Sequence, residues 1–185
     1  MTVAGALLAA GGGTRFSAKD GSHKLLADFR GRPLAEWSIE ALLEASFDES
    51  IVVIGAVDLD VPAEATVLRN ERWSAGLATS LALAIDHARD KGHAALVVGL
   101  ADQPMVPASA WRAVGAEEAA IAVATYEGVR GNPVRLDSSV WDALPREGDA
   151  GARYLMRLRP DLVREVPCEG TAADVDTVED LTKWS

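Results

Sequence analysis

The amino-acid sequence predicts a three-layer α/β/α sandwich with a mostly parallel sheet. Short, wholly apolar runs recur along the chain, and segments with helical periodicity fill the intervals between them. Such runs are typical of strands buried on both faces, and strands that alternate with helices pair in parallel through right-handed crossovers. The four clear runs are residues 3–9, 50–55, 94–100 and 120–126, and the weaker ones are residues 66–69 and 162–167.

Helices are predicted between the strands, where apolar residues recur at the spacing of one helix face. Pro33 favours the start of a helix, and Leu34, Trp37, Ala41 and Ala45 then form one stripe. Further helices are predicted at residues 77–91, from about residue 107, and at 137–144, 150–157 and 177–184. The last begins with Thr177 and Asp180, a pair that resembles a capping box.

The composition is that of an ordinary globular protein, with 49% hydrophobic and 25% charged residues, and we expect one domain over residues 1–185. A net charge of −10 argues against nucleic acid or an anionic membrane as the main partner. The single cysteine, Cys168, excludes an intrachain disulfide and a cysteine zinc cluster. The apolar N-terminal stretch has no basic segment before it and ends at Gly11, so we expect no signal peptide, no membrane span and a cytoplasmic location.

A glycine-rich loop follows the first predicted strand, at the sheet edge where ligands bind in this architecture. Glycines let a backbone approach a ligand and turn N–H groups toward phosphate oxygens, and Arg15 and Lys24 would add positive charge. The alternative is a plain turn. The loop is neither a P-loop nor a G-x-G-x-x-G motif, because Phe16 stands at the sixth position. The candidate nucleotide-binding residues here are Ala9, Ala10, Gly11, Gly12 and Gly13.

Aspartates follow two other elements. Asp102 comes just after the run at residues 94–100, where a carboxylate that holds Mg²⁺ is expected. The alternative for Asp102 is a turn or cap before Pro104. Asp174 and Asp176 lie on the same side of an extended segment, and Asp176 is alternatively the N-cap of the last helix.

Two weaker patterns remain. The spacing of Asn70, Trp73, Gly76 and Ser80 suits a segment that closes over a base and ribose, and residues 148–153 would present backbone amides and an arginine to a phosphorylated substrate. Each is alternatively a structural turn. The histidines show no metal-ligand spacing, although His23 adjoins Lys24, and no pattern indicates a covalent nucleophile.

Taken in chain order, these motifs resemble those of the molybdenum cofactor cytidylyltransferases and their guanylyltransferase relatives. The resemblance covers nearly the whole chain. It rests on L-A-A-G-G-x-x-R with K-L-L, G-R-P-L, N-x-x-W-x-x-G-x-x-x-S, D-Q-P, R-G-N-P-V, G-D-x-G-A-R and D-V-D-T-x-E-D-L.

The resemblance implies a Rossmann-like nucleotidyltransferase fold and a set of roles. The glycine loop, Arg15 and Lys24 would hold a triphosphate, Asp102 and Asp176 would hold Mg²⁺, and Arg15, Lys24 and Asp102 would be the catalytic residues. Gly76 and Ser80 would lie near the nucleotide, while Asn132, Asp149, Gly151 and Arg153 would face a pterin substrate. Two departures stand out: residues 17–23 lengthen the interval before Lys24, so that Lys19 is a rival, and Asn132 stands where the family often has histidine.

The implied reaction is attack of the terminal phosphate of molybdopterin on the α-phosphorus of a nucleoside triphosphate, with release of pyrophosphate. The L-A-A-G motif resembles the cytidylyl branch and favours CTP; a methyl group at Ala10 would narrow the base slot. The nucleoside triphosphate, a molybdopterin-type substrate, and a molybdoenzyme or its maturation chaperone are the implied partners.

Three other functions remain open at this point. One is transfer to a sugar or polyol phosphate, and another is a non-catalytic chaperone for molybdopterin insertion. A dinucleotide-binding oxidoreductase is a weaker alternative, since it needs an acidic residue at the end of the second strand, where Gly55, Ala56 and Val57 offer none.

Overall fold

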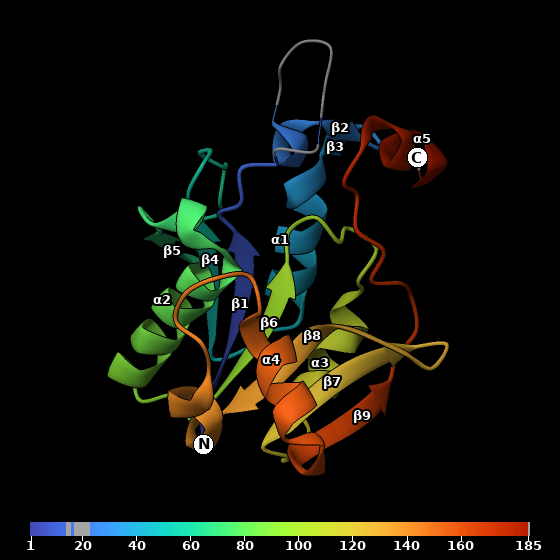
Figure 1. The fold of residues 1–185 in the computed structure, drawn as a ribbon. Coiled ribbons are helices and arrows are strands. Elements are labelled where there is room, and N and C mark those ends of the chain that lie inside the picture. Colours follow the sequence, from blue (N-terminus) through green and yellow to red (C-terminus); the bar gives the residue numbers. More distant parts are fainter. Residues whose placement is uncertain (14–15, 17–22, 185) are drawn as a thin grey trace.

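The computed structural model describes residues 1–13, 16 and 23–184, and its centre is a seven-stranded mixed sheet (Figure 1). The strand order is β5-β4-β1-β6-β8-β7-β9. The strands are β1 (Val3–Ala9), β4 (Glu49–Ile54), β5 (Thr66–Arg69), β6 (Ala95–Leu100), β7 (Ile121–Tyr126), β8 (Val129–Asp137) and β9 (Val163–Pro167). A separate two-stranded ribbon pairs β2 (Asp28–Phe29) with β3 (Arg32–Pro33). The predicted α/β class is confirmed.

Three of the four apolar runs are adjacent parallel strands, as the pattern predicts: β4, β1 and β6. The fourth run, β7, does not join them directly. β8 lies between β6 and β7 and is antiparallel to both. A two-residue turn makes this hairpin, because Glu127 and Gly128 both have positive φ, as tight hairpin turns require.

β8 was not predicted as a strand because its sequence includes Gly131 and Pro133, which are rare in strands. The sheet accommodates them through a register shift between Val123 and Ala124 on β7. The weak candidates at residues 66–69 and 162–167 are strands, β5 and β9, and both pair in parallel.

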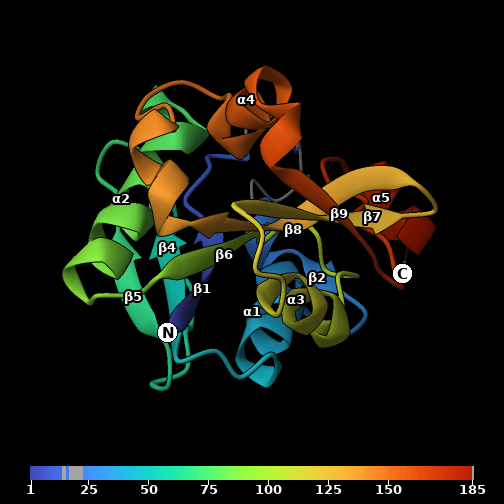
Figure 2. The same ribbon diagram turned by 90° about the horizontal axis from the view of Figure 1, so that it is seen from below.

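The helices cover both faces of the sheet (Figure 2). They are α1 (Leu34–Glu44), α2 (Leu77–Asp90), α3 (Ala108–Gly115), α4 (Gly151–Leu158) and α5 (Val178–Trp184). Short 3-10 helices are η1 (Lys24–Leu26), η2 (Trp73–Ala75), η3 (Ser138–Ala143) and η4 (Pro160–Leu162). The predicted helix at 137–144 is thus a 3-10 helix, which begins where the Asp137 side chain accepts a hydrogen bond from the Ser139 N–H.

Two hydrophobic cores lie on opposite faces of the sheet. One packs Leu34 and Leu42 of α1 and Trp111 of α3 against the sheet, and the other packs Leu81 and Ile85 of α2 on its far side. α1 and α3 therefore form one outer layer, with α2 and α4 in the other (Figure 2). Among the described residues, no helix has the length and apolar character needed to span a membrane.

Parallel pairing brings the ends of β1 and β6 to the same edge of the sheet. Leu8 pairs with Leu100, and the Leu8 carbonyl accepts a hydrogen bond of 3.1 Å from the Ala101 N–H. The glycine loop after β1 and Asp102 after β6 therefore share this edge, as predicted.

Candidate active site

Lys24 joins the two aspartates that the sequence marks as metal ligands. Its Nζ donates to Asp102 Oδ2 at 2.7 Å and to Asp176 Oδ1 at 2.8 Å. The Lys24 side chain is 11% exposed and each aspartate side chain is 22% exposed. Three positions that are far apart in the chain thus form one partly buried ionic cluster. Arg15 and Lys19, also predicted at the triphosphate, fall outside the described residues.

A backbone anchor brings Asp176 to Asp102. Val175 is fully buried, and its N–H donates a 2.9 Å hydrogen bond to the Asp102 carbonyl. With Val175 pointing into the core, its two acidic neighbours emerge on the other side of the extended segment.

Thr177 and Asp180 form hydrogen bonds to each other at the start of the last helix. Thr177 Oγ1 accepts from the Asp180 N–H at 3.1 Å, and Asp180 Oδ2 accepts from the Thr177 N–H at 2.9 Å. This reciprocal pair is the predicted capping box. The Asp176 carboxylate accepts a hydrogen bond from Lys24 Nζ.

The surroundings of the cluster raise the pKa of Lys24 and of the nearby Asp174. Burial alone lowers the pKa of Lys24, but the charge of Asp102 and hydrogen bonds to Asp102 and Asp176 outweigh it, so the pKa is raised and Lys24 stays protonated. Nearby, burial raises the pKa of Asp174, and the negative charge of Asp102 adds to that effect.

One oxygen of the cluster is unsatisfied. Asp102 Oδ1 is buried and accepts no hydrogen bond from the described residues. A buried carboxylate oxygen without a partner is costly unless a cation contacts it. Two carboxylates suit Mg²⁺, which completes its shell with water and phosphate oxygens. No group of three or more acidic, histidine or cysteine side chains in the described part of the chain forms a metal cage, so the remaining ligands would come from substrate and water.

His23 forms hydrogen bonds with both the glycine loop and η1, the 3-10 helix that contains Lys24. Its Nδ1 accepts from the Leu25 N–H at 3.2 Å, which caps η1, so Nε2 carries the proton and donates to the Gly11 carbonyl at 2.9 Å. Burial, followed by the charge of Lys24, lowers the pKa of His23 and keeps the ring neutral, although the bond to Gly11 opposes this. The sequence signal for this role was only the position of His23 beside Lys24.

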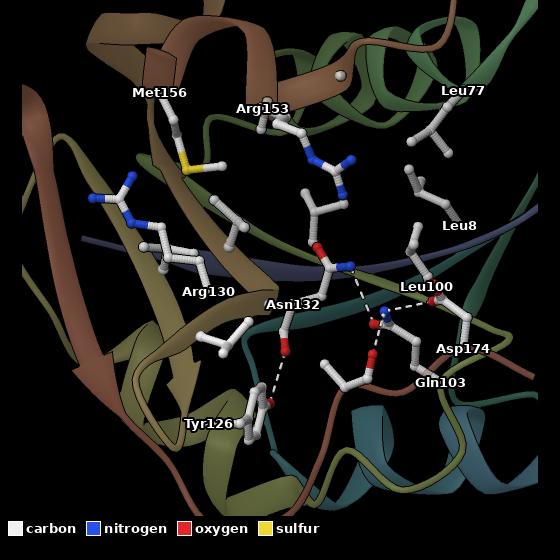
Figure 3. Close-up of a pocket in the computed structure, with 18 of the residues that line it drawn as sticks. Leu8, Leu77, Leu100, Gln103, Tyr126, Arg130, Asn132, Arg153, Met156 and Asp174 are labelled. Carbon is white, nitrogen blue, oxygen red and sulfur yellow. Dashed lines mark hydrogen bonds between the residues drawn. The ribbon is translucent and has the colours of Figure 1, made fainter. Parts of the chain in front are cut away.

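A cavity of about 1160 Å³ is lined in part by Asp174, two residues before Asp176 (Figure 3). Four predicted substrate residues line it: Asn132, Asp149, Gly151 and Arg153. Its walls are largely apolar, with Leu8, Leu77, Leu81, Val98 and Met156 among them. The described residues that line the cavity do not include residues 9–13, Gly76, Ser80 or the Lys24 cluster, so the predicted site divides into an ionic cluster and a neighbouring cavity.

Gln103 follows Asp102 in the chain, and its side chain binds three residues that line the cavity. Its Nε2 donates to Asp174 Oδ1 at 2.8 Å and to the Ala172 carbonyl at 3.0 Å, while Oε1 accepts from Asn132 Nδ2 at 3.1 Å (Figure 3). The Tyr126 hydroxyl donates to the Asn132 carbonyl at 2.7 Å. Gln103 was not predicted as a site residue; its only signal was its place in the D-Q-P motif.

Residues 148–149 cover the N-terminus of α2. The Ala78 N–H donates to the Gly148 carbonyl at 2.8 Å, and the Leu77 N–H donates to Asp149 Oδ1 at 3.3 Å. Gly76 makes this approach possible, since its φ is 106° and a Cβ atom there would lie 2.5 Å from the Gly148 carbonyl oxygen. Asp149 thus both lines the cavity and caps α2.

Ser80 lies below this helix start. It is only 3% exposed, and the buried Asn70 side chain donates to its hydroxyl at 2.9 Å and to that of Thr79 at 2.8 Å. Asn70 thereby fixes the first turn of α2 beneath Gly76.

Comparison with known proteins identifies the family. Residues 5–166 match the model of the MobA-like NTP transferase domain. Nicotine blue oxidoreductase of Paenarthrobacter nicotinovorans is 34% identical over 197 residues, which cover 97% of this chain and 94% of the relative. Among solved structures, Rv0371c of Mycobacterium tuberculosis is similar with a TM-score of 0.84 and 27% identity, over 100% of this chain and 97% of the other.

Two further structures are similar. A manganese complex of Rv0371c has a TM-score of 0.80 and 26% identity, over 100% of this chain and 98% of the other. A nucleotidyl transferase from Methanothermobacter has a TM-score of 0.81 at 21% identity, over 98% and 95% of the two chains, and shows the same fold. The family model covers most of the chain, and the protein therefore belongs to the MobA-like NTP transferase family.

Proposed function

We propose that this protein is an Mg²⁺-dependent nucleotidyltransferase that transfers CMP from CTP to the terminal phosphate of molybdopterin, with release of pyrophosphate. The observation that carries the proposal is the convergence of Lys24, Asp102 and Asp176 at the sheet edge that also holds the glycine loop. This arrangement combines two carboxylates for a metal, a cation for phosphate and a glycine-rich loop whose backbone amides would bind phosphate oxygens, which is the set that nucleotidyl transfer needs.

Asp102 and Asp176 would hold the metal, and the buried, unpartnered Asp102 Oδ1 supports this assignment. When bound, the cation offsets the charge of the triphosphate and of the departing pyrophosphate. The manganese complex of a mycobacterial relative supports a divalent ion.

The chain's own residues position two polyanions. The attacking phosphate is already an anion, so no protein base is required, and the protein acts through orientation and charge. Lys24, held by η1, supplies positive charge beside the loop. Arg153 points into the cavity (Figure 3) and has no carboxylate partner among the described residues, so its guanidinium is available to a phosphate. Arg130, in contrast, pairs with Glu165 at 2.7 Å.

We propose CTP because the L-A-A-G motif resembles that of the cytidylyl branch. The position of Ala10 does not support the expectation that its methyl group narrows the base slot. The methyl group of Ala10 is buried, at 3% exposure, and packs in the core beside Gly55. It therefore does not line a base slot directly. Any effect on the base comes through the path that this packing imposes on the loop.

A redox function is the competing candidate, because a relative at 34% identity is named an oxidoreductase. The end of β4 argues against the usual dinucleotide site. Ile54 is followed by Gly55, Ala56 and Val57, and the first acid, Asp58, pairs with Arg69 instead.

A product assay tests the proposal. The protein is incubated with Mg²⁺ and each nucleoside triphosphate in turn, with and without molybdopterin, and with sugar or polyol phosphates as other acceptors. We expect pyrophosphate with CTP and molybdopterin together, and the cytosine dinucleotide as product. The guanine dinucleotide would overturn the choice of base alone, and turnover only with a sugar or polyol phosphate would overturn the acceptor. Binding of molybdopterin without pyrophosphate release would indicate a chaperone, and oxidation of NADH or NADPH by an added dye without pyrophosphate would indicate a reductase.

A further inference from the structure

We propose that in the nucleotide-free protein Lys24 occupies the place between Asp102 and Asp176 that the divalent cation takes during transfer, so that the protein accepts the cation only together with a nucleoside triphosphate. This inference rests on the proposed function, because it assumes that these two aspartates are the metal ligands.

The contacts define a single cation position. Nζ lies 2.7 Å from Asp102 Oδ2 and 2.8 Å from Asp176 Oδ1. A divalent ion held by the same two oxygens would need the space between them that the ammonium group fills. The ammonium and the metal therefore exclude one another there.

The charge balance favours one cation at a time. Asp102, Asp174 and Asp176 bring three carboxylates to this edge, and Lys24 contacts two of them, Asp102 and Asp176. Partly buried carboxylates are stabilised by a cation in contact with them, and Lys24 supplies that charge in the nucleotide-free protein. As long as Lys24 does so, a free metal ion gains little by entering.

Lys24 also adjoins the glycine loop. Its stem runs beneath the glycine loop, since a Cβ atom at Gly13 would lie 3.2 Å from Lys24 Cγ. His23 holds the backbone of η1 to Gly11, and a change of the Lys24 side-chain rotamer would turn Nζ from the aspartates toward a phosphate on the loop. A triphosphate would thus draw Nζ away and present its own metal ion to the vacated carboxylates.

The functional consequence is coupled binding. Metal and nucleotide each raise the protein's affinity for the other. The nucleotide draws Lys24 away from the aspartates, and the metal takes its place there, so that Lys24 stays with the phosphate. The substrate is then the metal complex of the triphosphate rather than either component alone.

Mn²⁺ binding, measured from the electron paramagnetic resonance signal of the free ion, tests this directly. The wild type is compared with Lys24→Met, which keeps the apolar stem, and with Lys24→Arg, which keeps the charge. Lys91→Met is the matched control, because Lys91 is an exposed cation at the end of α2 and its loss changes the net charge equally.

Without nucleotide, we expect Lys24→Met to bind Mn²⁺ about tenfold more tightly than the wild type, since one unit of competing charge is removed. Lys24→Arg and Lys91→Met should match the wild type. With CTP present the order reverses, because Lys24→Met lacks the cation for the triphosphate, and the wild type binds Mn²⁺ more tightly than it does alone.

Equal or weaker Mn²⁺ affinity of nucleotide-free Lys24→Met overturns the inference, and so does a wild-type Mn²⁺ affinity that CTP leaves unchanged. The latter measurement, after subtraction of the Mn²⁺ that CTP binds without protein, needs no variant and serves even if Lys24→Met does not fold. Adding Asp102→Ala to Lys24→Met should remove the tight site. If the inference fails while the wild type still releases pyrophosphate and Asp102→Ala does not, the proposed function stands on its own.

Discussion

Asn132 Nδ2 donates a hydrogen bond of 3.1 Å to Gln103 Oε1, and this contact sets which group the cavity presents to a ligand. The backbone carbonyl of Ala172 can only accept, so Gln103 must turn its Nε2 toward it and its Oε1 toward Asn132. Asn132 then directs its amide nitrogen to Gln103, and its Oδ1 is left as an acceptor. In the proposed function, Asn132 Oδ1 would therefore accept a hydrogen bond from a donor group of the acceptor substrate.

Gln103→Met should lower both stability and acceptor affinity. The substitution keeps the volume but leaves the Ala172 carbonyl and Asn132 Nδ2 without partners, at a cost of about 1–3 kcal/mol in the free energy of unfolding. Urea denaturation measures this cost. In the transfer assay the KM for the acceptor should rise several-fold more than the KM for CTP. An unchanged acceptor KM would show that the orientation of Asn132 does not matter to the substrate.

Gly76→Ala should be far more damaging than Gly92→Ala. Both glycines have positive φ, 106° and 78°, but a Cβ atom at Gly92 meets nothing within 4 Å, whereas one at Gly76 meets the Gly148 carbonyl. We expect a loss of roughly 1 kcal/mol for Gly92→Ala from backbone strain and roughly 3 kcal/mol or more for Gly76→Ala from strain plus displacement of the loop. Thermal unfolding of the wild type and the two variants measures both losses of stability. Equal losses would mean that residues 148–149 do not stay on α2 in solution.

His23→Ala should weaken CTP binding, because Gly11 and η1 lose the side chain that joins them. The wild type should also lose CTP affinity as the pH falls below about 6.5, since a protonated ring cannot accept the Leu25 N–H. Burial lowers the pKa of His23, so the midpoint lies below that value, with the neutral form dominant above it. Titration of CTP affinity against pH checks this. A midpoint that persists in His23→Ala would assign the effect to another group.

Glu49 lies at the opposite end of the sheet from the candidate site, and it should make the free energy of unfolding depend on pH in the acid range. Burial opposes its ionisation, but hydrogen bonds with His87, His93 and Thr66 prevail and lower the pKa of Glu49 from 4.5 to about 2. Because the folded-state pKa is depressed, this stabilisation is complete above about pH 4.5 and disappears as the pH falls toward 2.

Glu49→Gln should flatten the stability profile between pH 5 and 2.5. The difference from the wild type at pH 6 should be on the order of 1 kcal/mol, less than the full pKa difference would give, because the carboxylate is partly solvated. Urea unfolding at a series of pH values measures it. Parallel profiles for the two proteins would contradict the assignment.

The sequence predicted the strands that are apolar throughout, and failed where local chemistry disagreed with the fold. β8 is not predicted as a strand, because Gly131, Asn132 and Pro133 are characteristic of turns. Pairing with β6 and β7 holds this segment in an extended conformation. The segment at residues 137–144 shows helical spacing, but Asp137 caps a tighter 3-10 turn instead.

The meeting of Asp102 with the glycine loop could be predicted, because it follows from parallel pairing. The contacts of Lys24 could not, since they depend on how β6, α5 and η1 meet in space and on the choice of a lysine rotamer. The role of Gln103 was equally hidden, because it depends on the carbonyl of Ala172, nearly seventy residues away in the chain.

Pyrophosphate release from CTP in the presence of molybdopterin and Mg²⁺, compared between the wild type, Asp102→Asn and Asp176→Asn, measures the proposed transfer most directly. Both variants keep the shape of the side chain and remove its charge, and circular dichroism establishes that they fold. We expect release by the wild type and a loss of about 10²-fold or more in each variant, because the metal that offsets the phosphate charge is no longer held. Release at the wild-type rate by Asp102→Asn, or no release by a folded wild type with any nucleoside triphosphate, would contradict it.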